Sequence, residues 1–201
     1  MILAFTSASS ERARSKRSSV WRVRNGTPNS SRNNRLKCRS LQCNCSASSG
    51  SDRVSGGSGA DNFVFNSKTG SDTLADFLSG TDHLQVSMAG IKVGDGDTAL
   101  EGAVTRSAAG GFSAAAELVV FTSNLASLSA SAAAAAIGSA TSAYAVGRTA
   151  LFAIDSGASS ALYLFTAADA NATVSAGELT LLATLSGTAS TLAASDYQFI
   201  A

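Results

Sequence analysis

The stretch Gly56-Gly57-Ser58-Gly59-Ala60-Asp61-Asn62-Phe63-Val64 decides how this chain folds, because its central part recurs on both sides. The recurring unit has the pattern Gly-x-Asp-x-apolar. It begins at Gly50, Gly59, Gly70 and Gly80, so the intervals are nine, eleven and ten residues. A single short unit cannot bury its apolar residue alone, so repeated units of this kind stack on one another. The sequence therefore predicts stacked turns and short strands over residues 47–100.

The residue types in this unit suit a calcium ion. Glycine reaches backbone conformations that let turn carbonyls surround an ion, and aspartate adds a charged oxygen. Calcium takes about six to eight oxygen ligands, so neighbouring turns must share each ion. The alternative interpretation is a series of ordinary Asp/Gly turns between strands. The candidate calcium ligands are Asp52, Gly57, Gly59, Asp61, Gly70, Asp72, Asp76, Gly80 and Asp82.

Spacing along the chain suggests which of these residues share an ion. The turns that carry Asp61 and Asp72 are expected to form the best pair, with Asp82 next. Asp76 follows Asp72 by four residues and is expected to share its site. His83 is the one histidine in the chain, and we expect it in a solvated loop. A lone histidine also excludes the His-pair chemistry of zinc proteases.

The net charge of +1 conceals an asymmetry between the two parts of the chain. Residues 1–50 carry ten Lys and Arg and one acid, whereas residues 51–201 carry five Lys and Arg and thirteen acids. The acidic part suits an exported protein that binds cations. All three cysteines lie before residue 46, with a spacing that fits no common zinc pattern. No segment contains the roughly 18 apolar residues that a membrane span needs.

Residues 1–46 form a basic head, rich in Ser, Arg and Asn, for which the sequence predicts disorder. Three interpretations compete for it. It resembles an organellar leader, it suits a nucleic-acid-binding arm, or it is a stretch read from another frame. The repeat pattern stops abruptly near residue 46, which favours the third interpretation. Binding to nucleic acid is not expected.

Beyond an expected linker at residues 101–112, residues 113–201 follow a different pattern. Apolar runs predict strands at 117–121, 150–154, 161–165 and 197–200, and the second and third of these flank a turn as a hairpin. Two helices are predicted, at 123–140 and at about 176–185. The order β-α-β-β-α-β is that of a ferredoxin-like fold. We therefore predict an α+β protein, with a short roll of calcium repeats before an antiparallel sheet that has two helices on one face.

Residues 169–178 offer a second, weaker candidate for calcium. Asp169, Asn171 and Glu178 have the spacing of late EF-hand ligands, but alanine holds the first ligand position and the position of the sharp glycine turn. Ser175 and Glu178 also fit a capping box at the start of the second predicted helix. The capping box explains these residues without an ion.

Residues 56–84 resemble the final repeats of bacterial RTX proteins, and the segments 116–118, 163–165 and 178–185 are similar to the bluetail domain of bacterial surface proteins. This resemblance implies calcium binding and export by a type I secretion system, which would be the partner of the chain. It also implies repeats that fold outside the cell, where calcium is abundant. The long repeat arrays and the N-terminal effector regions of the family are absent from this sequence.

These observations predict a non-catalytic, calcium-binding C-terminal module of a secreted or cell-surface protein, present as a monomer. The alternative is the tail of an extracellular protease or lipase whose catalytic part lies elsewhere. The chain has neither His-Glu-x-x-His nor Gly-x-Ser-x-Gly, so it is not expected to be an enzyme.

Overall fold

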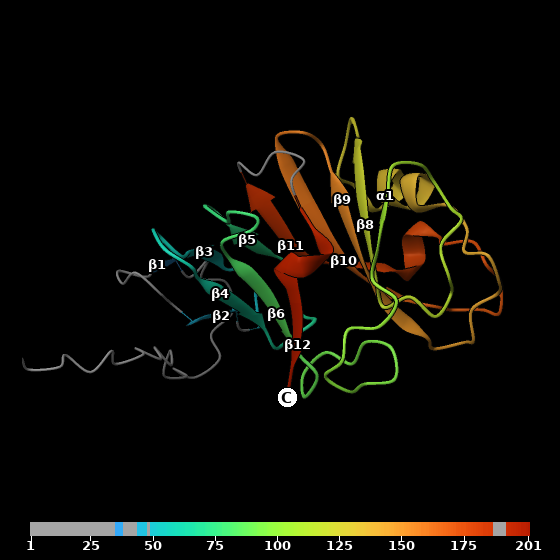
Figure 1. The fold of residues 1–201 in the computed structure, drawn as a ribbon, viewed down its shortest axis with the longest axis horizontal. Coiled ribbons are helices and arrows are strands. Elements are labelled where there is room, and N and C mark those ends of the chain that lie inside the picture. Colours follow the sequence, from blue (N-terminus) through green and yellow to red (C-terminus); the bar gives the residue numbers. More distant parts are fainter. Residues whose placement is uncertain (1–34, 38–43, 48, 187–191) are drawn as a thin grey trace, which may run out of the picture.

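The computed structural model describes residues 35–37, 44–47, 49–186 and 192–201, and strands in two sheets dominate this part of the chain (Figure 1). The larger sheet has eight strands in the order β1-β3-β5-β11-β10-β9-β8-β7, and the smaller has four in the order β12-β6-β4-β2. The strands are Arg35–Lys37 (β1), Asn44–Ala47 (β2), Arg53–Ser55 (β3), Asn62–Phe65 (β4), Asp72–Leu74 (β5), His83–Ser87 (β6), Val104–Arg106 (β7), Leu118–Asn124 (β8), Thr149–Asp155 (β9), Ser159–Thr166 (β10), Leu179–Ser186 (β11) and Tyr197–Ile200 (β12).

Strands β1 to β6 alternate between the two sheets. β1, β3 and β5 pair in parallel in the larger sheet, and β2, β4 and β6 pair in parallel in the smaller one. We call one strand from each sheet, together with the turns that connect them, a coil. The apolar residue of each repeat unit points between the sheets: Val54, Phe63, Leu74 and Leu84 are almost completely buried. Alternation of side chains along each strand produces this arrangement.

The last two strands of the chain form another coil on the same two sheets. β11 runs parallel to β5, with Thr184 opposite Thr73, and β12 runs parallel to β6, with Tyr197 opposite Leu84. Figure 1 shows both strands, in red, beside the green strands of the repeats. The larger sheet is therefore continuous from the repeat region into the C-terminal half, across the expected linker.

The ferredoxin-like fold predicted for residues 113–201 is wrong. In the described residues, the one α-helix is Ala130–Ile137 (α1), and the region predicted as the second helix is strand β11 after a short 3-10 turn, Ala176–Glu178. The Leu- and Thr-rich run of β11 pairs with β10 on one side and with β5 on the other. These partners override a helix preference that is weak by comparison. The predicted hairpin is present as antiparallel β9 and β10.

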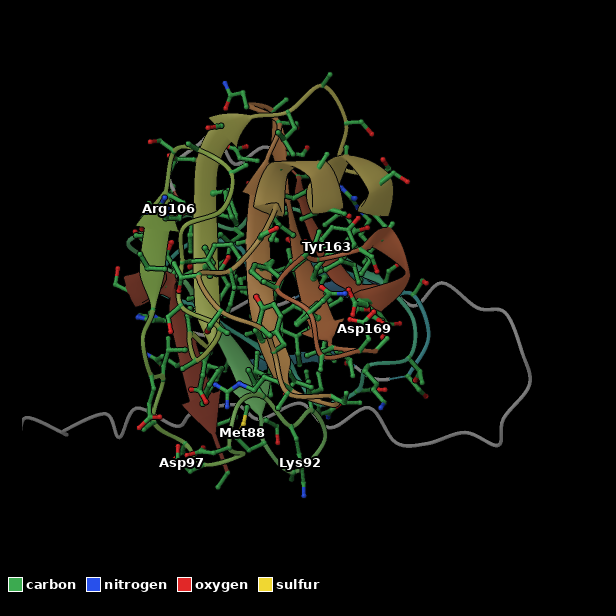
Figure 2. All side chains as sticks on the ribbon, turned by 90° about the vertical axis from the view of Figure 1, so that its right-hand side faces the viewer. Met88, Lys92, Asp97, Arg106, Tyr163 and Asp169 are labelled. Carbon is green, nitrogen blue, oxygen red and sulfur yellow. The ribbon has the colours of Figure 1, made fainter. Side chains whose placement is uncertain are left out.

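Apolar residues cover both faces of the larger sheet in the region of β8–β10. One cluster fills the space between the two sheets and continues under β8–β10, and it includes Phe63, Leu84, Leu118 and Leu162. The other lies between the sheet and α1 with its flanking loops. Figure 2 shows α1 across this second face, where the Tyr163 hydroxyl donates to the carbonyl of Leu128 at 2.5 Å.

Most of the basic head, for which the sequence predicts disorder, lies outside the described residues. Two short parts are described as strands. Arg35 lies opposite Arg53 in the larger sheet, and Asn44 lies opposite Asn62 in the smaller one, each an offset of 18 residues. Cys45 is buried in the core between the sheets. The parallel ladders thus extend one coil beyond the Gly-x-Asp units.

Candidate functional site

The turns of alternate strands stack on one another at the two ends of the coils. At one end, the Gly50 amide donates to the Thr69 carbonyl at 3.2 Å. A Cβ atom at Gly70 would lie only 2.1 Å from the Gly50 carbonyl oxygen, so this approach requires glycine. At the other end, turn 56–61 lies against turn 75–82, where the amides of Gly56 and Asp61 donate to the carboxylates of Asp76 and Asp82. Because the strands alternate between sheets, consecutive turns lie at opposite ends.

Four of the predicted aspartates form two stacked pairs. The Asp52 amide donates to Oδ1 of Asp72 at 2.9 Å, and the Asp61 amide donates to Oδ1 of Asp82 at 3.0 Å. All four residues are buried, with at most 5% of their surface exposed. The structure therefore pairs Asp61 with Asp82 and Asp52 with Asp72. It does not pair Asp61 with Asp72, which we expected from their closeness in sequence.

Glycines make room for the Asp61 carboxylate within its own turn. A Cβ atom at Gly56 would lie 2.5 Å from Oδ2 of Asp61, so that carboxylate lies directly over the Gly56 backbone. Gly57 and Gly59 have φ angles of 95° and 113°, which other residues rarely adopt. Gly-Gly-x-Gly-x-Asp is thus the pattern that this turn requires.

The carboxylate of Asp76 contacts the coil that precedes it and not Asp72. Its carboxylate accepts hydrogen bonds from the Ser55 hydroxyl at 2.6 Å, the Gly56 amide at 2.9 Å and the Gly57 amide at 3.0 Å. A carboxylate offers about four lone-pair positions, and three are occupied here. Asp76 therefore holds the preceding turn and is poorly suited to bind an ion.

Asp196 belongs to the same end of the coils, and the sequence did not point to it. Its carboxylate accepts hydrogen bonds from the Ser79 hydroxyl at 2.6 Å, the Gly80 amide at 2.9 Å and the Ala193 amide at 2.9 Å. No glycine precedes Asp196 in the repeat position, so no repeat pattern marks it. The recurrence of Ser-Gly at residues 55–56 and 79–80 was the available signal.

Burial and a like charge shape the electrostatics of the Asp72 pair. Burial raises the pKa of Asp72 to about 6, the Asp52 amide that donates to it acts in the opposite direction, and the negative charge of Asp52 raises it further. A cation between these turns would remove the repulsion and favour the ionised form.

The donor set fits calcium only if backbone oxygens supply most of the ligands. Among the residues that the structure describes, no three His, Cys, Asp or Glu side chains come together to hold a metal ion. Each stacked pair has two buried carboxylates, and an ion beside them would need backbone carbonyl oxygens of the turns as further ligands. Calcium accepts such mixed oxygen ligands. Asp52 with Asp72 and Asp61 with Asp82 fit this chemistry, whereas Asp76 does not.

The weaker candidate, around Glu178, is occupied by protein donors. One oxygen of Glu178 accepts the Ala168 amide at 2.8 Å, and the other accepts the amide and hydroxyl of Ser175 at 2.8 and 2.9 Å. Burial raises the pKa of Glu178, but these hydrogen bonds outweigh it and hold the pKa below its usual value. The capping interaction is present, but it begins the short 3-10 turn before strand β11 instead of an α-helix.

His83 lies in strand β6 and is half-buried, so its predicted place in a solvated loop is wrong. Its amide donates to the Asp61 carbonyl at 2.8 Å and joins two neighbouring coils.

No family model matches the chain, and neither a curated protein nor a solved structure matches it. In the part of the chain that the structure describes, no helix has the length and apolar character to cross a membrane.

Proposed function

We propose that this chain is a non-catalytic, calcium-binding module of a secreted or cell-surface protein, and that calcium stabilises its stacked coils. The observation that supports this most is the pairing of buried aspartates across stacked turns. Each pair places two carboxylates where water reaches them poorly, which is costly without a compensating charge. A divalent cation supplies that charge.

The residues that would hold calcium are Asp52 with Asp72 at one end of the coils and Asp61 with Asp82 at the other. Calcium would add a central positive charge that both carboxylates share. The glycines at positions 57, 59, 70 and 80 would let the turn backbones contribute carbonyl oxygens, since all four have φ angles between 77° and 113°. Asp76 is left out of this set.

Export through a type I secretion system is the second part of the proposal and rests on the RTX-like repeats. Calcium is scarce in the cytosol and abundant outside cells. A module whose coils need calcium would therefore stay loosely folded before export and become stable afterwards, because metal binding contributes directly to folding free energy.

Calorimetric titration with calcium chloride tests the binding proposal. We expect the wild-type chain to bind calcium with a dissociation constant between about 10⁻⁴ and 10⁻³ M, as extracellular modules do. Melting temperature should rise with calcium concentration, and Asp61→Asn combined with Asp82→Asn should reduce both responses. No heat of binding at millimolar calcium, together with an unchanged melting temperature, would refute the proposal.

Asp97→Asn is the matched control for these variants. Asp97 is an exposed aspartate in a glycine-containing turn outside the coils, and Figure 2 shows it in the outer loop. The substitution Asp97→Asn removes one negative charge and changes neither stacked pair. Magnesium chloride serves as the control ion, because its strict octahedral geometry suits shared turn carbonyls poorly.

A further inference from the structure

Two carboxylates at one end of the coils contact the turns in the same way, although they come from unrelated positions in the chain. Asp76 accepts the Ser55 hydroxyl and the Gly56 amide at 2.6 and 2.9 Å. Asp196 accepts the Ser79 hydroxyl and the Gly80 amide at 2.6 and 2.9 Å. Each therefore binds a Ser-Gly pair of the coil before it.

The two turns that are held in this way carry the aspartates of one stacked pair. Gly56 begins the turn that ends at Asp61, and Ser79 and Gly80 lie in the turn that ends at Asp82. We propose that Asp76 and Asp196 are positioning residues, each of which fixes the preceding turn so that its aspartate and carbonyl groups face the calcium position. This inference rests on the proposed function for the identity of the ion.

The hydrogen bonds themselves explain how a carboxylate can fix a turn. Amide and hydroxyl groups that donate to an ionised carboxylate form hydrogen bonds that are shorter and roughly twice as strong as those between neutral groups. Asp196 is 1% exposed, so water competes little for its donors. A turn rich in glycine has many alternative conformations when free, and two or three such bonds exclude most of them.

Hydrogen-bond capacity separates these residues from ligands. Asp76 and Asp196 each accept three donors. Asp82 accepts two, from the amides of Asp61 and Leu78. With about four lone-pair positions on a carboxylate, Asp82 retains room for an ion that Asp76 and Asp196 largely lack.

The hydrogen bonds of Asp196 also join distant parts of the chain. Gly80 and Asp196 are 116 positions apart, and Asp196 directly precedes strand β12. The shape of the turn at Asp82 therefore depends on the C-terminal coil, whereas the turn at Asp61 depends on its immediate neighbour through Asp76.

Amide hydrogen exchange with and without calcium chloride, combined with calorimetric titration, tests the inference. Asp76→Asn should speed exchange at Gly56 and Gly57 by roughly tenfold, since a charge-assisted bond is lost, and leave Gly80 unchanged. Asp196→Asn should speed exchange at Gly80 by a similar factor and leave Gly56 and Gly57 unchanged. Both variants should bind the same number of calcium ions as the wild type, with a dissociation constant raised about tenfold.

Ser55→Ala and Ser79→Ala are milder variants that each remove one hydroxyl donor and keep the carboxylate. They should produce the same local pattern with smaller changes, so the test does not depend on the folding of the aspartate variants. Asp97→Asn should leave exchange at both turns unchanged.

Two results would overturn the inference. Loss of one bound ion in Asp76→Asn or Asp196→Asn would make that residue a ligand, and equal acceleration at both turns would make the effect a general loss of stability. If the wild type binds no calcium, the proposed function fails, and the exchange pattern alone still decides whether the two carboxylates hold the turns.

Discussion

The coils and the C-terminal half share one sheet, but they stabilise it in different ways. In the coils, β3 and β5 are three residues long, and buried aspartates bind the turns between them. In the C-terminal half, β9 and β10 have seven and eight residues and bury apolar side chains on both faces. The coils add polar contacts at their turns to the apolar core between the two sheets, whereas β8–β10 are stabilised mainly by apolar packing on both faces.

This difference has a consequence for folding. Apolar burial needs no ion, so the sheet around β8–β10 should be stable in calcium-free buffer. In the coils, the negative charge of Asp52 helps to raise the pKa of the buried Asp72, and a bound cation would relieve this repulsion. We therefore expect calcium to act mainly on the coils.

The largest effect should come from the packed half. Phe152 is completely buried and contacts the rings of Phe112 and Phe165, with centroids 5.5 and 5.6 Å away. Phe152→Ala should lower the free energy of unfolding by about 3–5 kcal/mol, because it removes apolar contacts and leaves a cavity. Urea denaturation with and without calcium measures this. A loss that calcium restores would contradict the division between the two regions.

The second effect concerns where calcium protects the backbone. At a calcium concentration a hundred times the dissociation constant, binding stabilises the structure that holds the ion by about 2.7 kcal/mol. Hydrogen exchange of β3–β6 and β12 should slow by about a hundredfold under these conditions, while β8–β10 change much less. Equal protection of both regions would show that the molecule unfolds as one unit, and that the coils do not differ from β8–β10 in their dependence on calcium.

A third effect follows from the raised pKa of Asp72, about 6 against 3.8 for an ordinary aspartate. The folded protein holds this proton more tightly than the unfolded chain, so calcium-free stability should fall as pH rises from about 4 to 6. Calcium needs the ionised carboxylate. Calcium affinity should therefore weaken below pH 6, by up to about tenfold per pH unit.

Asp72→Asn is the variant for this pH dependence, followed by thermal melting and titration between pH 4 and 8. It should remove the fall in calcium-free stability over that range and weaken calcium binding at every pH. Retention of the wild-type pH profile would assign the effect to another group.

The smallest effect should come from an exposed apolar residue in the coils. Leu78 is 61% exposed in the turn that carries Asp82, and its amide donates to that carboxylate at 2.8 Å. Leu78→Ala keeps this hydrogen bond and should change the free energy of unfolding by less than about 0.5 kcal/mol. A larger loss in thermal melting would show that the coil turns also rely on apolar packing.

Local patterns predicted the parts of the structure that depend on neighbouring residues. The Gly-x-Asp-x-apolar spacing located strands β3 to β6, and Asp155 to Ser159 marked the turn of the hairpin. These features follow from backbone conformations and side-chain alternation within about ten residues. The buried positions of Val54, Phe63, Leu74 and Leu84 follow from the same alternation.

Patterns of this kind failed where distant partners decide the outcome. Residues 179–186 contain good helix formers and follow a capping pair, yet they form β11, because β10 and β5 provide strand partners on both sides. Asp61 and Asp72 are close in sequence but lie at opposite ends of the coils, because strand β4 runs from one end to the other between them.

The repeat alone was enough to specify the turn chemistry: glycines where φ is positive, an aspartate over the backbone and an apolar residue pointing inward. Only the tertiary structure decided which turns face each other, that strands β11 and β12 complete the sheets, and that Asp196 holds the turn at Ser79 and Gly80. The physical reason is the distance along the chain between the residues that interact. Turn geometry is set by neighbouring residues, whereas stacked turns and paired strands are set by contacts between segments that can be more than a hundred residues apart.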